Sequence, residues 1–124
     1  MDIYKELTPA EIVKSLTLLP SAIGSQARKV ERARQEVDIA EQDLEFQKAV
    51  RYIELEGQFE KISVKDLEMR TVATESIQKS EAKRIEKIGQ YKMENITLQE
   101  LENKFISIRK IASIRETELK VIPE

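Results

Sequence analysis

From Ser63 to Ile122 the chain runs for about sixty residues with no proline and a single glycine, Gly89. Apolar or nearly apolar residues recur through this stretch, mostly seven apart, at Ile77, Tyr91, Leu98, Phe105, Ala112 and Leu119. The pattern predicts one long helix, because a seven-residue repeat keeps these side chains on one helical face. At ~1.5 Å per residue the helix would be roughly 85 Å long, so another helix or another subunit must cover its apolar face.

The composition limits both the core and the chemistry. Of 124 residues 5% are aromatic and 35% are charged, and the formal net charge is −2, so we expect one domain over residues 1–124 with a thin, elongated core. The sequence has no cysteine, histidine or tryptophan, which excludes Cys/His zinc sites, disulfides, thiol nucleophiles and imidazole catalysis. We therefore predict a protein that is not an enzyme, with no catalytic residue, metal site or cofactor.

The chain carries no recognisable export or membrane signal. Its first residues are partly acidic and lack the basic and apolar segments of a signal peptide. No eighteen apolar residues run together, so no membrane-spanning helix is predicted. We expect a cytoplasmic protein without a membrane partner.

Start and stop signals divide the rest of the chain. The expected helices cover about residues 9–19, 22–56 and 64–121. Thr8, Pro9 and Glu11 suit the N-cap, N1 and N3 positions of the first helix. Pro20 is predicted to end that helix, because the residue before a proline avoids the α conformation. Gly57 is predicted to supply the left-handed residue that follows the second helix.

The third helix has the clearest start. Ser63 suits the N-cap and Asp66 the N3 position, while Ile62 and Leu67 suit a hydrophobic staple. The connection from Gly57 is short, so the second and third helices should be antiparallel neighbours. Two residues that lie opposite each other on these helices should then have residue numbers that add up to about 121. The expected fold is all-α, with a short N-terminal helix and a long antiparallel helical hairpin of the coiled-coil type.

Two stretches could bind partners. Near its C-terminal end the third helix has apolar residues on more than one face. This apolar surface is larger than a short first helix can bury. We predict a homo-oligomer, most simply a dimer, with Leu101, Phe105, Ile108 and Ile111 at the contact. The alternative is that Tyr4, Leu7 and Val13 cover these residues within the monomer.

Basic residues of both hairpin helices should meet near the middle of the hairpin. They are Arg28, Lys29, Arg32, Lys83, Arg84 and Lys87. Such a patch could contact phosphates, and a nucleic-acid-binding accessory protein is our second hypothesis. Carboxylates such as Glu36 and Glu86 are interleaved with the basic residues, which favours the simpler interpretation of a solvated helix face.

Carboxylates also gather near the predicted turn, among them Glu54, Glu56 and Glu60. A third hypothesis is a regulator that inserts this acidic tip into a host enzyme. Phe46, Tyr52 and Phe59 lie nearby, and core packing is the expected role of these aromatic residues.

The chain resembles small hairpin proteins encoded by bacteriophages and prophages. The resemblance covers about residues 10 to 119 and rests on the Leu19-Pro20 pair, the Glu56-Gly57 turn, and Arg70 ahead of Ala73-Thr74. It implies a viral or mobile-element origin and an accessory role, near DNA replication or recombination, with an unidentified protein partner. It brings no catalytic residues with it.

Overall fold

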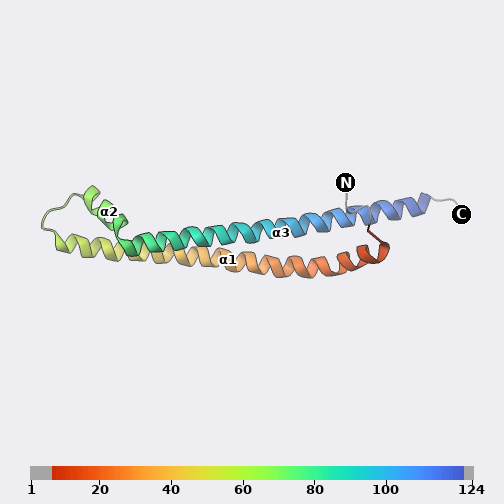
Figure 1. The fold of residues 1–124 in the computed structure, drawn as a ribbon, viewed down its shortest axis with the longest axis horizontal. Helices are drawn as coiled ribbons and strands as arrows, with labels where there is room; N and C mark the ends of the chain where they lie inside the picture. The colour runs from red at the N-terminus through yellow and green to blue at the C-terminus, as the bar shows by residue number, and fades with distance from the viewer. Residues whose placement is uncertain (1–6, 122–124) are drawn as a thin grey trace. The chain divides into compact units, whose positions relative to one another are not determined.

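The computed structural model describes residues 7–121, and within them it contains three α-helices and no strand. Helix α1 covers Pro9–Gln58, α2 covers Val64–Ala73 and α3 covers Glu75–Val121 (Figure 1). The predicted all-α class is confirmed. The described chain divides into two contact units, which we call the terminal unit (residues 7–30 and 94–121) and the turn unit (residues 31–93). A single domain over residues 1–124 stays a prediction.

Helix α1 begins as predicted but does not stop at Pro20. The Thr8 hydroxyl accepts a hydrogen bond from the Glu11 N–H at 3.2 Å, which confirms the N-cap. The helix then continues through Pro20 to Gln58, so the predicted bounds 9–19 and 22–56 are wrong. A proline inside a helix costs about 3 kcal/mol. Tertiary packing offsets this cost, because Leu19 and Gln26, on either side of the proline, are both buried.

The end of α1 also differs from the prediction at Gly57. No described residue has a positive φ, so Gly57 is not a left-handed C′ residue. The helix includes Gly57 and ends one residue later. The Phe59 N–H donates to the Glu56 carbonyl at 3.4 Å, and this i to i+3 bond tightens the last turn without a left-handed residue.

Helix α2 begins at the predicted start signal. The Ser63 hydroxyl accepts a hydrogen bond from the Asp66 N–H at 3.1 Å, and Ser63 is the N-cap as predicted. Leu67 is buried and Ile62 is half-buried, the pattern expected of the predicted staple.

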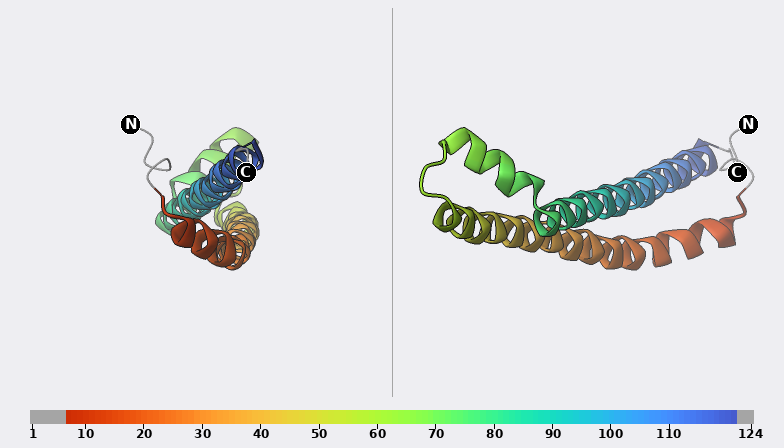
Figure 2. Two further views of the ribbon diagram at one scale, coloured as in Figure 1. Left: turned by 90° about the vertical axis from the view of Figure 1, so that its right-hand side faces the viewer. Right: turned by 60° about the vertical axis from the view of Figure 1, so that its left-hand side comes forward.

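The predicted single helix over residues 64–121 is interrupted at Thr74. This residue has an extended backbone (ψ 135°), and α2 and α3 change direction there (Figure 2). The Thr74 hydroxyl donates to the Arg70 carbonyl at 3.0 Å and accepts from Arg51 of α1 at 3.2 Å. The break therefore coincides with a contact to α1, which the sequence pattern does not show.

Polar contacts across the two long helices show that they are antiparallel within each unit. In the terminal unit Gln26 of α1 bonds Glu94 of α3. In the turn unit the paired residues are Glu36 with Lys87, Glu41 with Arg84, Gln47 with Ser80, and Arg51 with Thr74. The numbers of these pairs total between 120 and 127, within a few residues of the expected 121.

The two units have different cores. In the turn unit, α1 presents small residues to α3, and Ala33 and Ala40 are buried as the alanine-rich sequence suggests. Ile77 of α3 is 2% exposed there. Leu44, Leu55 and Leu67 are also buried in the turn unit. The terminal unit has Ile12, Leu19 and Ile108 at its centre.

Candidate interaction surfaces

The residues predicted to mediate self-association lie in the core of the terminal unit. Ile108 is 1% exposed, so it is buried within one chain. The residues that pack around Ile12, Leu19 and Ile108 are Leu7, Leu16, Leu101, Phe105, Ile111 and Ala112. The N-terminal part of α1 therefore covers these residues within one chain, and Ile108 is not available to a second chain.

The monomer alternative is confirmed only in part. Leu7 packs against this core, whereas Val13 is 63% exposed and does not cover it. Tyr4 lies outside the described residues. The sequence pattern could not distinguish these cases, because it does not show that α1 continues through Pro20 and extends along α3.

The six predicted basic residues fall in different units. Arg28 and Lys29 belong to the terminal unit, and both are exposed. Arg32, Lys83, Arg84 and Lys87 belong to the turn unit. The two groups are described separately, and binding of nucleic acid by them stays a prediction.

Within the turn unit, carboxylates pair with half of the predicted basic residues. Lys87 forms an ion pair with Glu36 at 3.2 Å, and Arg84 contacts Glu81 on its own helix and Glu41 of α1 at 3.9 Å. These pairs neutralise two cations and connect the helices.

Arg32 and Lys83 make no ion pair with any residue of the described chain, and both are exposed. Of the predicted basic residues in this unit, Arg32 and Lys83 are therefore the two whose charges are not neutralised by a carboxylate of the described chain.

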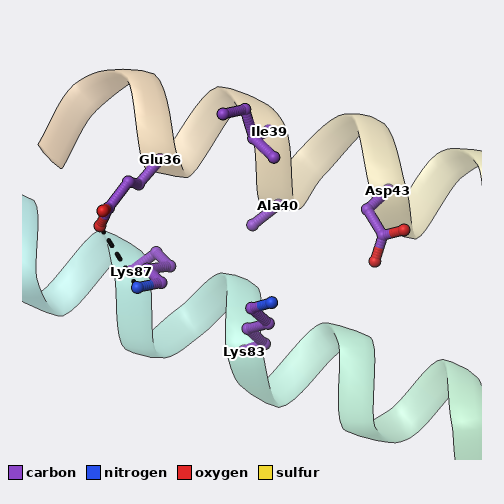
Figure 3. A pocket seen from close by; sticks show the side chains of 6 residues that line it. All are labelled: Glu36, Ile39, Ala40, Asp43, Lys83 and Lys87. Carbon is purple, nitrogen blue, oxygen red and sulfur yellow. Dashed lines mark hydrogen bonds and ion pairs between the residues drawn. The ribbon is translucent and has the colours of Figure 1, made fainter. Parts of the chain in front are cut away.

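A shallow groove lies between α1 and α3 at this level. It has a volume of about 440 Å³ and is lined by Glu36, Ile39, Ala40, Asp43, Lys83 and Lys87 (Figure 3). Lys87 points across the groove to Glu36, and the two basic residues come from α3 while both carboxylates come from α1 (Figure 3). Because charges of both signs line the groove, it has no strong preference for an anionic or a cationic ligand.

Ion pairs along single helices shift the pKa of two carboxylates in the turn unit. A hydrogen bond from the Arg34 guanidinium lowers the pKa of Glu31, and one from Arg84 lowers the pKa of Glu81. The Arg34–Glu31 pair is exposed and the Arg84–Glu81 pair is half-buried. Water still reaches both pairs, so they stabilise the helices weakly.

The turn has a second shallow hollow of about 560 Å³, lined by Tyr52, Glu56, Phe59, Glu60, Lys61, Ile62, Ser63, Val64 and Leu67. The guanidinium of Arg70 lies 4.7 Å from the centre of the Phe59 ring, so this aromatic residue packs within the chain. Among the described residues no three Asp or Glu side chains are placed to hold a metal ion.

The strongest exposed feature is an apolar stripe on α1 that the sequence analysis missed. Ile39, Phe46 and Ile53 are 65%, 68% and 69% exposed, and Val50 is 40% exposed. The prediction that Phe46 packs in the core is wrong. The seven-residue spacing of Ile39, Phe46 and Ile53 was the available signal. It was overlooked because Ala40 and Leu44 form a second apolar pattern that already accounts for the helix.

No stretch of the described helices combines the length and apolarity that crossing a bilayer requires. Comparison with known proteins gives no relative: no family model, curated protein or solved structure matches the chain.

Proposed function

We propose that this protein is a non-enzymatic helical interaction module that self-associates as a coiled-coil assembly. The observation that supports the proposal is the exposed α1 stripe of Ile39, Phe46, Val50 and Ile53. On the other side of the same helix Ala40 and Leu44 are buried against α3. A helix that is apolar on two sides is typical of one that lies between two partners.

The experiment measures molar mass by light scattering across a range of protein concentrations. The parent should exceed the 14.4 kDa of one chain at micromolar to high micromolar concentration, where coiled-coil contacts of this size associate. Phe46→Ser should shift the mass toward the monomer without loss of helix, because the side chain is exposed. A monomeric parent over the whole range would disprove self-association.

Val13→Ser is the matched control. Val13 is 63% exposed, like Phe46, but lies outside the stripe. Its replacement should leave the mass unchanged. An equal effect of both substitutions would indicate general loss of apolar surface rather than a specific contact.

A second candidate function is non-specific binding of nucleic acid through the turn unit. It is supported by Arg32 and Lys83, whose charges are not paired within the described chain. Binding of a fluorescent DNA duplex should weaken steeply with salt, because phosphate contacts release counterions. Arg32→Glu with Lys83→Glu should abolish it, while Lys65→Glu on α2 should not. Absence of binding by the parent at about 20 mM salt would exclude this function.

We also propose an accessory role for a virus or mobile element, on the resemblance to phage hairpin proteins. In such a role the acidic tip would be the contact, and its carboxylates Glu56 and Glu60 are exposed at the connection between α1 and α2. This acidic tip could dock on a host enzyme. Two-hybrid or cross-linking tests with Glu56→Lys and Glu60→Lys would show whether a captured partner depends on the tip.

A further inference from the structure

The apolar α1 stripe has an acidic border. From residue 36 to residue 56 the helix carries seven carboxylates and two basic residues. The carboxylates are Glu36, Asp38, Glu41, Asp43, Glu45, Glu54 and Glu56, and all seven are exposed. The two basic residues, Lys48 and Arg51, are half-buried. The surface around Phe46 therefore combines apolar side chains with a clear excess of negative charge.

This border disfavours contact of the stripe with its own copy about a two-fold axis. Such a contact through Phe46 would align two acidic segments and place Glu45 of each chain beside the other. Like charges brought together oppose association. A better occupant has an apolar row bordered by basic residues.

The chain contains such a surface on α3. Residues 104–115 include four basic residues, Lys104, Arg109, Lys110 and Arg115, and no carboxylate. On the helix side away from buried Ile108, Ile106 is 59% and Ile114 is 53% exposed. Ile106, Lys110 and Ile114 are spaced four apart, so they form one row with the lysine between the two isoleucines. We call this row the basic α3 face.

We propose that the α1 stripe of one copy packs against the basic α3 face of a second copy. The inference rests on the proposed self-association and identifies its contact. Opposite charges favour this pairing. The stripe from Ile39 to Ile53 spans about 21 Å and the basic α3 face from Ile106 to Ile114 about 12 Å, so the face can cover the central part of the stripe around Phe46. Phe46 is the largest exposed side chain of the stripe and is the expected anchor.

The test exchanges charge on each face separately. Glu45→Lys changes the border of the α1 stripe, and Lys110→Glu changes the basic α3 face. Each variant alone should self-associate at least fivefold more weakly than the parent, measured by sedimentation equilibrium at low salt. When the two variants are mixed, the two altered faces again carry opposite charges. Each chain also keeps one parental face, so association should return to near the parental level.

Matched controls carry the same charge changes elsewhere. Glu68→Lys lies on α2, and Lys92→Glu lies on α3 outside residues 104–115; both residues are exposed. Neither should change association, and circular dichroism should show unchanged helix content in all four variants.

The outcomes separate this inference from the proposed function. If the parent is monomeric, both are wrong. If the parent associates and Phe46→Ser prevents it, but Lys110→Glu associates as the parent does, the stripe contacts another α1 stripe and the α3 face is not its partner. If each single variant weakens association and their mixture does not restore it, the two residues do not face each other and the inference is wrong.

Discussion

The terminal unit and the turn unit use the same two helices, but they differ in where their large apolar side chains lie. In the terminal unit, Ile108 and its large neighbours point inward, and the exposed row of Ile106 and Ile114 lies on α3. In the turn unit the inner positions of α1 are filled partly by Ala33 and Ala40, while Ile39 and Phe46 point outward.

The polar contacts between the helices also differ between the two units. The terminal unit has the buried Gln26 side chain, whose amide donates to the Glu94 backbone carbonyl at 2.8 Å and to its carboxylate at 2.7 Å. The turn unit has ion pairs and hydrogen bonds at several levels. Large apolar residues are buried in both units, so the polar contacts of each unit add to an apolar core. The exposed stripe of the turn unit is apolar area beyond that core and is free for a partner.

The largest effect should come from truncating a core isoleucine in each unit. Ile108→Ala and Ile77→Ala remove side chains that are 1% and 2% exposed, and each should lower the free energy of unfolding by about 2–5 kcal/mol. Native-state hydrogen exchange should show whether the loss of stability is confined to the unit that carries the substitution. If Ile108→Ala increases exchange equally in both units, they unfold together and the division between them has no energetic meaning.

Pro20→Ala should stabilise the terminal unit. Pro20 is exposed inside α1, and alanine restores the missing backbone N–H, so a gain of up to about 3 kcal/mol is expected. Thermal unfolding followed by circular dichroism measures it. A loss of stability would mean that the helix needs a bend at this residue in order to pack.

Gly57→Ala gives a smaller effect in the turn unit, and its sign is informative. Gly57 is helical and no atom lies within 4 Å of an added Cβ, so alanine should stabilise by about 0.5–1 kcal/mol. If residue 57 were left-handed in solution, alanine would instead destabilise the protein. Chemical denaturation of the parent and of Gly57→Ala distinguishes a helical from a left-handed residue 57.

The smallest effect concerns the loss of stability at low pH, which we expect to arise mainly in the turn unit. The folded-state pKa of Glu81 is lowered from 4.5 by its bond from Arg84. Ionised Glu81 therefore adds to the free energy of unfolding above pH 4.5, and this stabilisation is lost as the pH falls through the lower pKa of the folded state. Glu81→Gln should flatten the decline in stability between about pH 5 and pH 3 slightly. Equal declines in parent and variant would show that the bond does not persist in solution.

Local sequence patterns were enough to predict the helical class, the starts of α1 and α2, and the antiparallel arrangement. The caps at Thr8 and Ser63 were predictable because an N-cap depends on a side chain and backbone N–H groups three residues away. The buried alanines were predictable because helical periodicity is a local property of the chain.

The positions of the helix breaks and the choice of apolar residues that stay exposed depend instead on tertiary packing. Pro20 lies inside α1 because packing on α3 outweighs a local preference, and Thr74 interrupts the last helix at a contact with Arg51 of α1. The same holds for the candidate surfaces. Ile108 and Phe46 are both apolar residues on amphipathic helices, and only the position of the neighbouring helix buries the first and leaves the second exposed.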